Sequence, residues 1–235
     1  MWHALAIGTL AVSSLLLGAG LALAVRLPPR AVGLLLAFGA GALISSLSFE
    51  LADEAIDEGG VVLFGVGLAL GALTFYAGDR ALGEGRPHRK GANASGAVLA
   101  LGAQLDGIPE QTALGISLAG GAKVDVALIV AIFVSNLPEA VGSAAELRKA
   151  GSTPRKILLL WGGVAVTGIL ATAFGYGLLD GASGAVRGAV DAFAAGAVLC
   201  MLIDSMVPEA RGDGGPGAGL ATMLGFAVAV ALSQS

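Results

Sequence analysis

Long apolar segments recur along the whole of this chain, separated by short stretches that carry most of its charged residues. Most of these segments are at least 20 residues long, which is the length that an α-helix needs to cross the hydrocarbon core of a bilayer. The pattern therefore predicts an all-α membrane protein with eight transmembrane helices. The predicted helices are 3–25, 31–57, 61–82, 94–120, 124–149, 154–179, 185–210 and 215–234.

The composition supports a membrane protein. Hydrophobic residues make up 56% of the chain, charged residues only 13%, and the mean hydropathy is +0.85; soluble domains carry about 25% charged residues. The 38 glycines suit membrane helices, whose backbones approach closely at small residues. The lipid bilayer is thus the expected partner. A net charge of −4 and dispersed basic residues do not suggest nucleic acid binding, and the lone Cys200 excludes an intrachain disulfide.

Basic residues favour one side of the predicted bundle. Eleven of the thirteen Lys and Arg residues fall in the first, third, fifth and seventh connections, and only Lys123 and Arg187 fall on the opposite side. Connections rich in Lys and Arg usually face the cytoplasm. We therefore expect a multi-pass protein of the cell membrane, plasma or inner, with both termini extracytoplasmic.

A weak internal repeat relates the second and seventh predicted helices. The segment 38–43 resembles 193–198, and Glu54–Ala55 matches Glu209–Ala210, all at an offset of 155 positions. The two helices run in opposite directions, so the repeat is inverted, an arrangement common in secondary transporters. Chance similarity between Gly/Ala-rich helices competes with this interpretation, but the shared offset favours a true repeat.

The repeat predicts a 3+2+3 arrangement of the eight helices within one transmembrane domain. The first three-helix repeat spans 1–82, the central helix pair spans 94–149, and the second three-helix repeat spans 154–235. In secondary transporters built this way, the binding site lies near the middle of the membrane, at the interface between the repeats.

The central pair carries two near-copies of one motif. Asp106-Gly-Ile-Pro-Glu110 in the fourth helix is followed by Ser135-Asn-Leu-Pro-Glu139 in the fifth. Residues four apart share a helix face, and ionisable groups at this depth are costly and retained mostly for function. Two such faces meeting would form a cation site. The predicted metal ligands are Asp106, Glu110, Ser135, Asn136 and Glu139.

A proline sits inside each motif. Pro109 cannot donate a backbone hydrogen bond, so it bends the helix and frees the carbonyl of Leu105, and Pro138 does the same for Val134. A freed carbonyl in a membrane needs a partner such as water, a neighbouring helix or an ion. The same Pro–Glu spacing occurring twice favours a cation site over packing alone.

Two further carboxylates lie inside predicted helices. Glu50 and Asp204 occupy neighbouring positions of the proposed repeat, in the second and seventh helices. They could extend an ion path or add a ligand, and a structural role in contact with water or a basic partner is equally consistent with the sequence. A cluster of acidic residues, Asp53, Glu54, Asp57 and Glu58, ends the second predicted helix. A solvated helix end explains this cluster better than a cation-attracting vestibule.

The two motifs, with the Val207-Pro-Glu-Ala210 segment, resemble those of the ZIP (zinc/iron-regulated transporter-like) metal transporters. The resemblance covers nearly the whole chain in topology, but in specific residues only the motifs and the ends of the second and seventh helices. It implies eight helices in a 3+2+3 inverted arrangement, termini outside, and divalent metal ions held midway across the membrane and moved toward the cytoplasm. Homodimers are common in that family, so a homodimer is open here.

The resemblance carries over residue by residue only in part. Glu110, Glu139 and both prolines match the family motifs, and Asn136 stands at the second ligand position of the fifth helix. Asp106 and Ser135 stand where the family has histidines. Gly107 replaces an asparagine ligand, Gln111 replaces the motif glycine, and no histidine remains in a predicted helix.

These departures leave a site made of oxygen ligands, which suits harder ions such as manganese better than zinc. The expected substrate is a divalent cation of the Zn, Fe, Mn and Cd class, with no organic cofactor and no enzymatic reaction. Because the family histidines are replaced, the alternative stays open that this protein is a relative that binds a metal ion, for example as a sensor, without transporting it. An intramembrane aspartyl protease pairing Asp106 with Asp204 is a further alternative that the sequence supports less.

Overall fold

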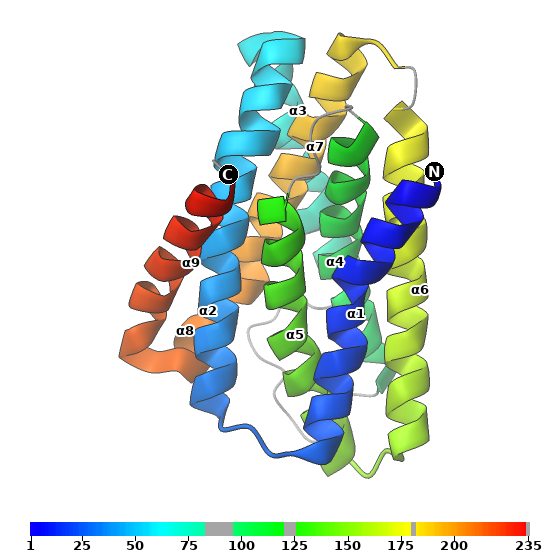
Figure 1. Ribbon diagram of the computed structural model, residues 1–235, viewed down its shortest axis with the longest axis vertical. Helices are drawn as coiled ribbons and strands as arrows, with labels where there is room; N and C mark the ends of the chain where they lie inside the picture. Colours follow the sequence, from blue (N-terminus) through cyan, green and yellow to red (C-terminus); the bar gives the residue numbers. More distant parts are fainter. Residues whose placement is uncertain (83–95, 120–125, 180–181, 234–235) are drawn as a thin grey trace.

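The computed structural model describes residues 1–82, 96–119, 126–179 and 182–233, and every regular element in those ranges is helical. The long helices lie side by side in one elongated bundle (Figure 1). The helices are α1 (Trp2–Ala24), α2 (Pro29–Ser46), α3 (Ala52–Leu82), α4 (Gly96–Ala119), α5 (Val126–Lys149), α6 (Pro154–Leu179), α7 (Gly184–Met201), α8 (Val207–Gly214) and α9 (Ala218–Ser233).

Six segments of the described residues are long and apolar enough to cross a membrane. The last of them, Gly184–Ser233, holds all of α7, α8 and α9. Helix length and hydropathy thus identify a multi-pass helical membrane protein, as the sequence predicts. The candidate spans are Trp2–Ala24, Pro29–Phe49, Ala52–Arg80, Leu128–Ala145, Pro154–Leu178 and Gly184–Ser233.

Two of the long helices contain a π-helical turn. The turn η1 (Leu47–Leu51) joins α2 to the start of α3, and η2 (Leu202–Met206) joins α7 to α8. Such turns are rare and occur often at functional sites, because they widen the helix and redirect its side chains. The two turns begin 155 positions apart, which is the offset of the sequence repeat.

The helix breaks follow the same offset. Gly60 interrupts α3 with φ 77°, and Gly215 follows α8 with φ 64°. Glycine adopts this left-handed backbone without steric cost, so it ends a helix readily. The break at Gly60 lies between the predicted second and third helices, and therefore the boundary that the sequence predicts falls inside α3.

Close backbone contacts also recur in the two halves. A Cβ atom on Gly41 of α2 would collide with the carbonyl of Thr222 in α9, and one on Gly196 of α7 would collide with the carbonyl of Leu68 in α3. Gly41 and Gly196 are again 155 positions apart. The glycines thus let α2 lie against α9 and α7 against α3, as small residues do in membrane helix pairs.

The remaining helices surround the motif-bearing pair. α1 packs on α5 and α6 packs on α4, while α2 and α7 contact α5 and α4 respectively. In Figure 1, α2 runs upward and α7 runs downward, so these matching helices are antiparallel. The motifs therefore lie inside the bundle, between α1 and α6 on one side and α2 and α7 on the other.

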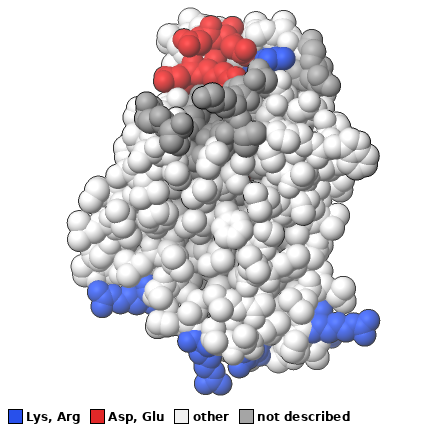
Figure 2. Space-filling view, viewed as in Figure 1, with Lys and Arg blue, Asp and Glu red and all other residues white. Residues whose placement is uncertain are grey.

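The charges are segregated along the bundle axis. Figure 2 shows Lys and Arg mostly at the lower end, and a group of acidic residues at the upper end. The lower end holds the connection between α1 and α2, which contains Arg26, and the start of α6, which contains Arg155. Arg148 also lies there and donates hydrogen bonds to the carbonyls of Ala22 and Leu23, at 3.1 and 3.0 Å, at the end of α1.

Candidate metal site

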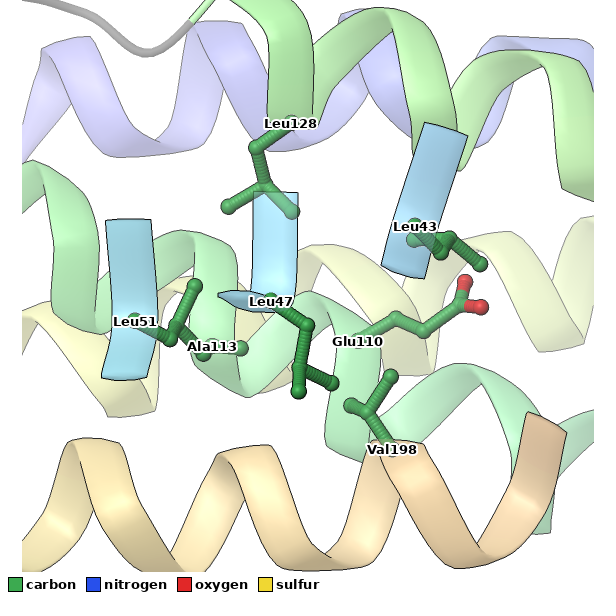
Figure 3. Close-up of a pocket in the computed structure, with 7 residues that line it drawn as sticks. All are labelled: Leu43, Leu47, Leu51, Glu110, Ala113, Leu128 and Val198. Atoms are coloured by element: carbon green, nitrogen blue, oxygen red, sulfur yellow. The ribbon is translucent and has the colours of Figure 1, made fainter. Parts of the chain in front are cut away.

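Glu110 is buried in the centre of the bundle. Its side chain is 4% exposed and reaches from α4 toward Leu43 of α2 (Figure 3). It lines a cavity of about 10 Å³, enough for about one water molecule. The other described residues that line it are apolar: Leu43, Leu47, Leu51, Ala113, Leu128 and Val198.

The walls of this cavity come from both halves of the repeat. Leu47 and Leu51 belong to the π turn η1, and Val198 lies in α7 one turn before η2. The π turn η1 therefore lies beside the cavity that Glu110 lines, and η2 begins one turn after the lining residue Val198. Carboxylate oxygens are ligands that hard divalent cations prefer, so Glu110 is a candidate ligand from α4.

The α5 motif is buried as well. Ser135 and Asn136 are 2% and 3% exposed, Pro138 is fully buried, and Glu139 is half-buried. The hydroxyl of Ser135 donates a hydrogen bond to the carbonyl of Ile132 at 3.0 Å. Its oxygen can still accept from, or ligate, another group, so the structure leaves a ligand role for Ser135 open.

Asn136 faces a different cavity from Glu110. This second cavity, also about 10 Å³, lies where α1, α4, α5 and α6 meet. Gln111, the residue after Glu110, lines it with Asn136, and the other lining residues are Val12, Leu15, Gly107, Ile108, Val164 and Gly168. The predicted ligands are thus distributed over two sides of the α4–α5 pair.

The predicted ligand set is described only in part. The side chains of Asp106 and Glu50 lie outside the described residues. Asp106 as a metal ligand and Glu50 as a residue of the ion path therefore stay predictions. Among the described side chains, no group of three or more His, Cys, Asp or Glu residues is arranged to hold a metal ion. A site at this position would depend on mixed ligands, namely carboxylates with the amide, hydroxyl and freed carbonyl oxygens.

Asp204 lies away from the motifs. It is exposed in η2, lines neither cavity, and accepts a hydrogen bond from the thiol of Cys200 at 3.5 Å. Asp204 also interacts electrostatically with Asp79 of α3. These contacts favour a role for Asp204 on the α3–α7 surface over one as a ligand beside Glu110.

Glu209 is a residue that the sequence analysis left out of the site. Its Oε1 atom lies 4.0 Å from the position that a Cβ on Gly142 would occupy, so the carboxylate lies against α5. Gly142 is three residues beyond Glu139, on the same face of the helix. Pro208 and Glu209 repeat the Pro–Glu pair of the two motifs, and this signal in the sequence could have placed Glu209 among the candidate site residues.

A second missed residue lies at the acidic end of the bundle. Asp191 of α7 is only 3% exposed, and Glu54, Glu58 and Arg187 act on it electrostatically. The acidic end of the second helix is therefore a packed junction with α7 as well as a solvated helix end. Sequence reasoning did not single out Asp191, because nothing in its spacing relates it to Glu54.

A search of protein-family models and of curated proteins finds no match to this chain. Its function must therefore be argued from the motifs, the burial of their side chains and the repeated architecture.

Proposed function

We propose that this protein is a divalent metal permease similar to the ZIP transporters. The single observation that carries the proposal is the position of two Pro–Glu motifs inside a multi-pass helical bundle, with Glu110 and Pro138 buried. Glu110 and Asn136 line cavities on opposite sides of the central pair, and Glu139 lies on the same helix as Asn136. The expected ligands remain Asp106, Glu110, Ser135, Asn136 and Glu139.

The proposed architecture is eight membrane crossings in a 3+2+3 inverted repeat. The recurrence of π turns, glycine breaks and glycine contacts at one offset supports it, as does the antiparallel course of α2 and α7. The end rich in Lys and Arg would face the cytoplasm, with both termini outside. Inverted repeats place a site between units that can move against each other.

Transport would proceed by alternating access. Glu110 is closed off from solvent by leucines in this conformation, so an ion can reach it only after the surrounding helices move. Carboxylate and amide oxygens would replace part of the ion's hydration shell, and the mixed oxygen set favours Mn²⁺ over Zn²⁺. An ion must also leave, so moderate affinity suits this role.

Uptake into liposomes tests the proposal. The purified protein would be reconstituted, and uptake of Mn²⁺, Fe²⁺, Zn²⁺, Cd²⁺ and Mg²⁺ would be compared with empty liposomes. The double variant Glu110→Gln/Glu139→Gln should abolish saturable uptake, while Asp53→Asn, which removes one exposed carboxylate, should retain it. Absence of flux from a folded wild-type protein that still binds Mn²⁺ would instead support the metal-sensor alternative.

A further inference from the structure

Gln111 is the most completely buried amide described in this bundle. It is 1% exposed, and its Nε2 atom has no hydrogen-bond partner among the described residues. Its Oε1 accepts a hydrogen bond from the hydroxyl of Thr172 in α6 at 2.8 Å. Buried polar groups are nearly always satisfied by protein or by ordered water, so the unpaired end of this amide requires an explanation.

The hydrogen bonds of Thr172 can satisfy only one end of the Gln111 amide. Its single hydroxyl proton lies within reach of two acceptors, Gln111 Oε1 at 2.8 Å and the carbonyl of Gly168 at 3.2 Å. If the proton goes to Gly168, the amide of Gln111 turns over and donates from Nε2 to Thr172. In either arrangement Thr172 holds one end of the amide, and the other end still needs a partner.

The cavity that Gln111 shares with Asn136 offers the place for that partner. It has room for about one water molecule, and Asn136 is also buried, with 3% of its surface exposed. The remaining lining residues are apolar or glycine. The described lining holds two neutral amides and no carboxylate, so it does not compensate the desolvation of a divalent ion, whereas water can donate to and accept from both amides.

We propose that this cavity binds one water molecule that bridges the carboxamides of Gln111 and Asn136, which makes Gln111 a positioning residue for Asn136. The role of Asn136 as an ion ligand rests on the proposed function. The chain of contacts runs from Thr172 on α6 through Gln111 on α4 and the water to Asn136 on α5. It would fix the direction in which the Asn136 oxygen points, as outer hydrogen bonds fix the ligands of metal sites.

A stability cycle tests the water bridge without transport. The apparent Tm of the full-length protein in detergent would be measured for wild type, Gln111→Leu, Asn136→Ala and the double variant. With the bridge present, each single change should lower Tm by about 2–4 °C. The double variant should lose little more than either single change, since both remove one shared interaction.

A dry cavity predicts the opposite result. Replacing an amide whose end is buried and unpaired with leucine would then raise Tm or leave it unchanged, and the two changes would add. That outcome would overturn the water site. With the bridge present, Thr172→Val should lower Tm as Gln111→Leu does, but by a smaller amount. Its matched control is Thr74→Val, because Thr74 is exposed and bonds only the carbonyl of Leu70, at 2.7 Å.

Kinetics test the positioning role. In liposomes, Gln111→Leu should raise the KM for Mn²⁺ by about tenfold, the lower end for outer partners of metal ligands. The maximal rate should stay close to that of wild type, because the carboxylate ligands are intact. If the Tm effects of Gln111→Leu and Asn136→Ala are non-additive but Gln111→Leu leaves the KM unchanged, the positioning role would be overturned. If those Tm effects are non-additive but the wild-type protein transports no ion, the proposed function would be overturned while the water site is supported.

Discussion

Glu110 and Gln111 are neighbours on α4, yet they lie in opposite kinds of surroundings. Glu110 reaches among leucines from α2 and α5 and a valine from α7, whereas Gln111 bonds a hydroxyl on α6 and shares a cavity with an amide on α5. Successive residues of a helix point about 100° apart. A helix enclosed on both sides can therefore present a charge to one set of neighbours and an amide to the other.

The two surroundings differ in what they demand energetically. Neutral amides can be satisfied by a hydroxyl and one water, so the Gln111 side is stable without any ion. A buried carboxylate such as that of Glu110 is an anionic oxygen ligand of the kind that divalent cations prefer. This difference is the reason for placing ion binding on the Glu110 side and a supporting role on the Gln111 side.

The largest effect should come from exchanging the two residues. In Glu110→Gln/Gln111→Glu the carboxylate moves to the cavity shared with Asn136, whose other described lining residues carry no charge. We expect Mn²⁺ uptake to fall to the level of empty liposomes and the protein to lose about 3–5 kcal/mol of stability, as for an uncompensated buried charge. Chemical unfolding and uptake measure the two effects. Uptake equal to wild type would show that the two sides are equivalent.

A smaller change separates charge from packing. Glu110→Gln keeps the size of the side chain, so we expect its stability without metal to change by less than about 1 kcal/mol. Wild type should gain about 2.7 kcal/mol when Mn²⁺ is present at a hundred times its Kd. The variant should gain nothing and should not transport. A variant with the same Mn²⁺-induced rise in Tm as wild type would remove Glu110 from the ligand set.

The apolar wall can be tested separately. Leu47→Ala enlarges the cavity beside Glu110 and should cost about 2 kcal/mol, the low end for buried leucines. Leu10→Ala is the matched control, because Leu10 is 55% exposed whereas Leu47 is 9% exposed. Equal loss of stability in the two variants would mean that the wall around Glu110 is loosely packed. Denaturant titration in the same detergent gives both values.

The smallest effect is expected at an exposed carboxylate. Asp53→Asn removes a charge at the acidic end, outside both cavities, and should change stability by less than about 0.5 kcal/mol. Any increase in the KM for Mn²⁺ should be modest and should disappear at high salt, since exposed charges are screened. A loss of uptake as large as that of Glu110→Gln would make the acidic end part of the transport site.

Several features could be read from the chain without a structure. Runs of apolar residues with punctuating Gly, Pro and charged residues predict where helices begin and end, because the length and the hydrogen-bonding needs of a membrane helix are local properties. The offset of 155 positions predicts matching elements, and the π turns and the breaks at Gly60 and Gly215 follow it. The π turns themselves carry no sequence signal that we could identify.

Tertiary structure decided which side chains share a cavity. Asp106 and Glu110 share a helix face by periodicity alone, but spacing does not say which helices that face meets. Packing of α4 between α6 and α7 sends Glu110 and Gln111 to different neighbours, and the position of α8, which packs on α2, brings the Glu209 carboxylate beside Gly142 of α5. Such contacts join residues far apart in sequence, and they depend on how glycine-lined helices fit together, which no local pattern contains.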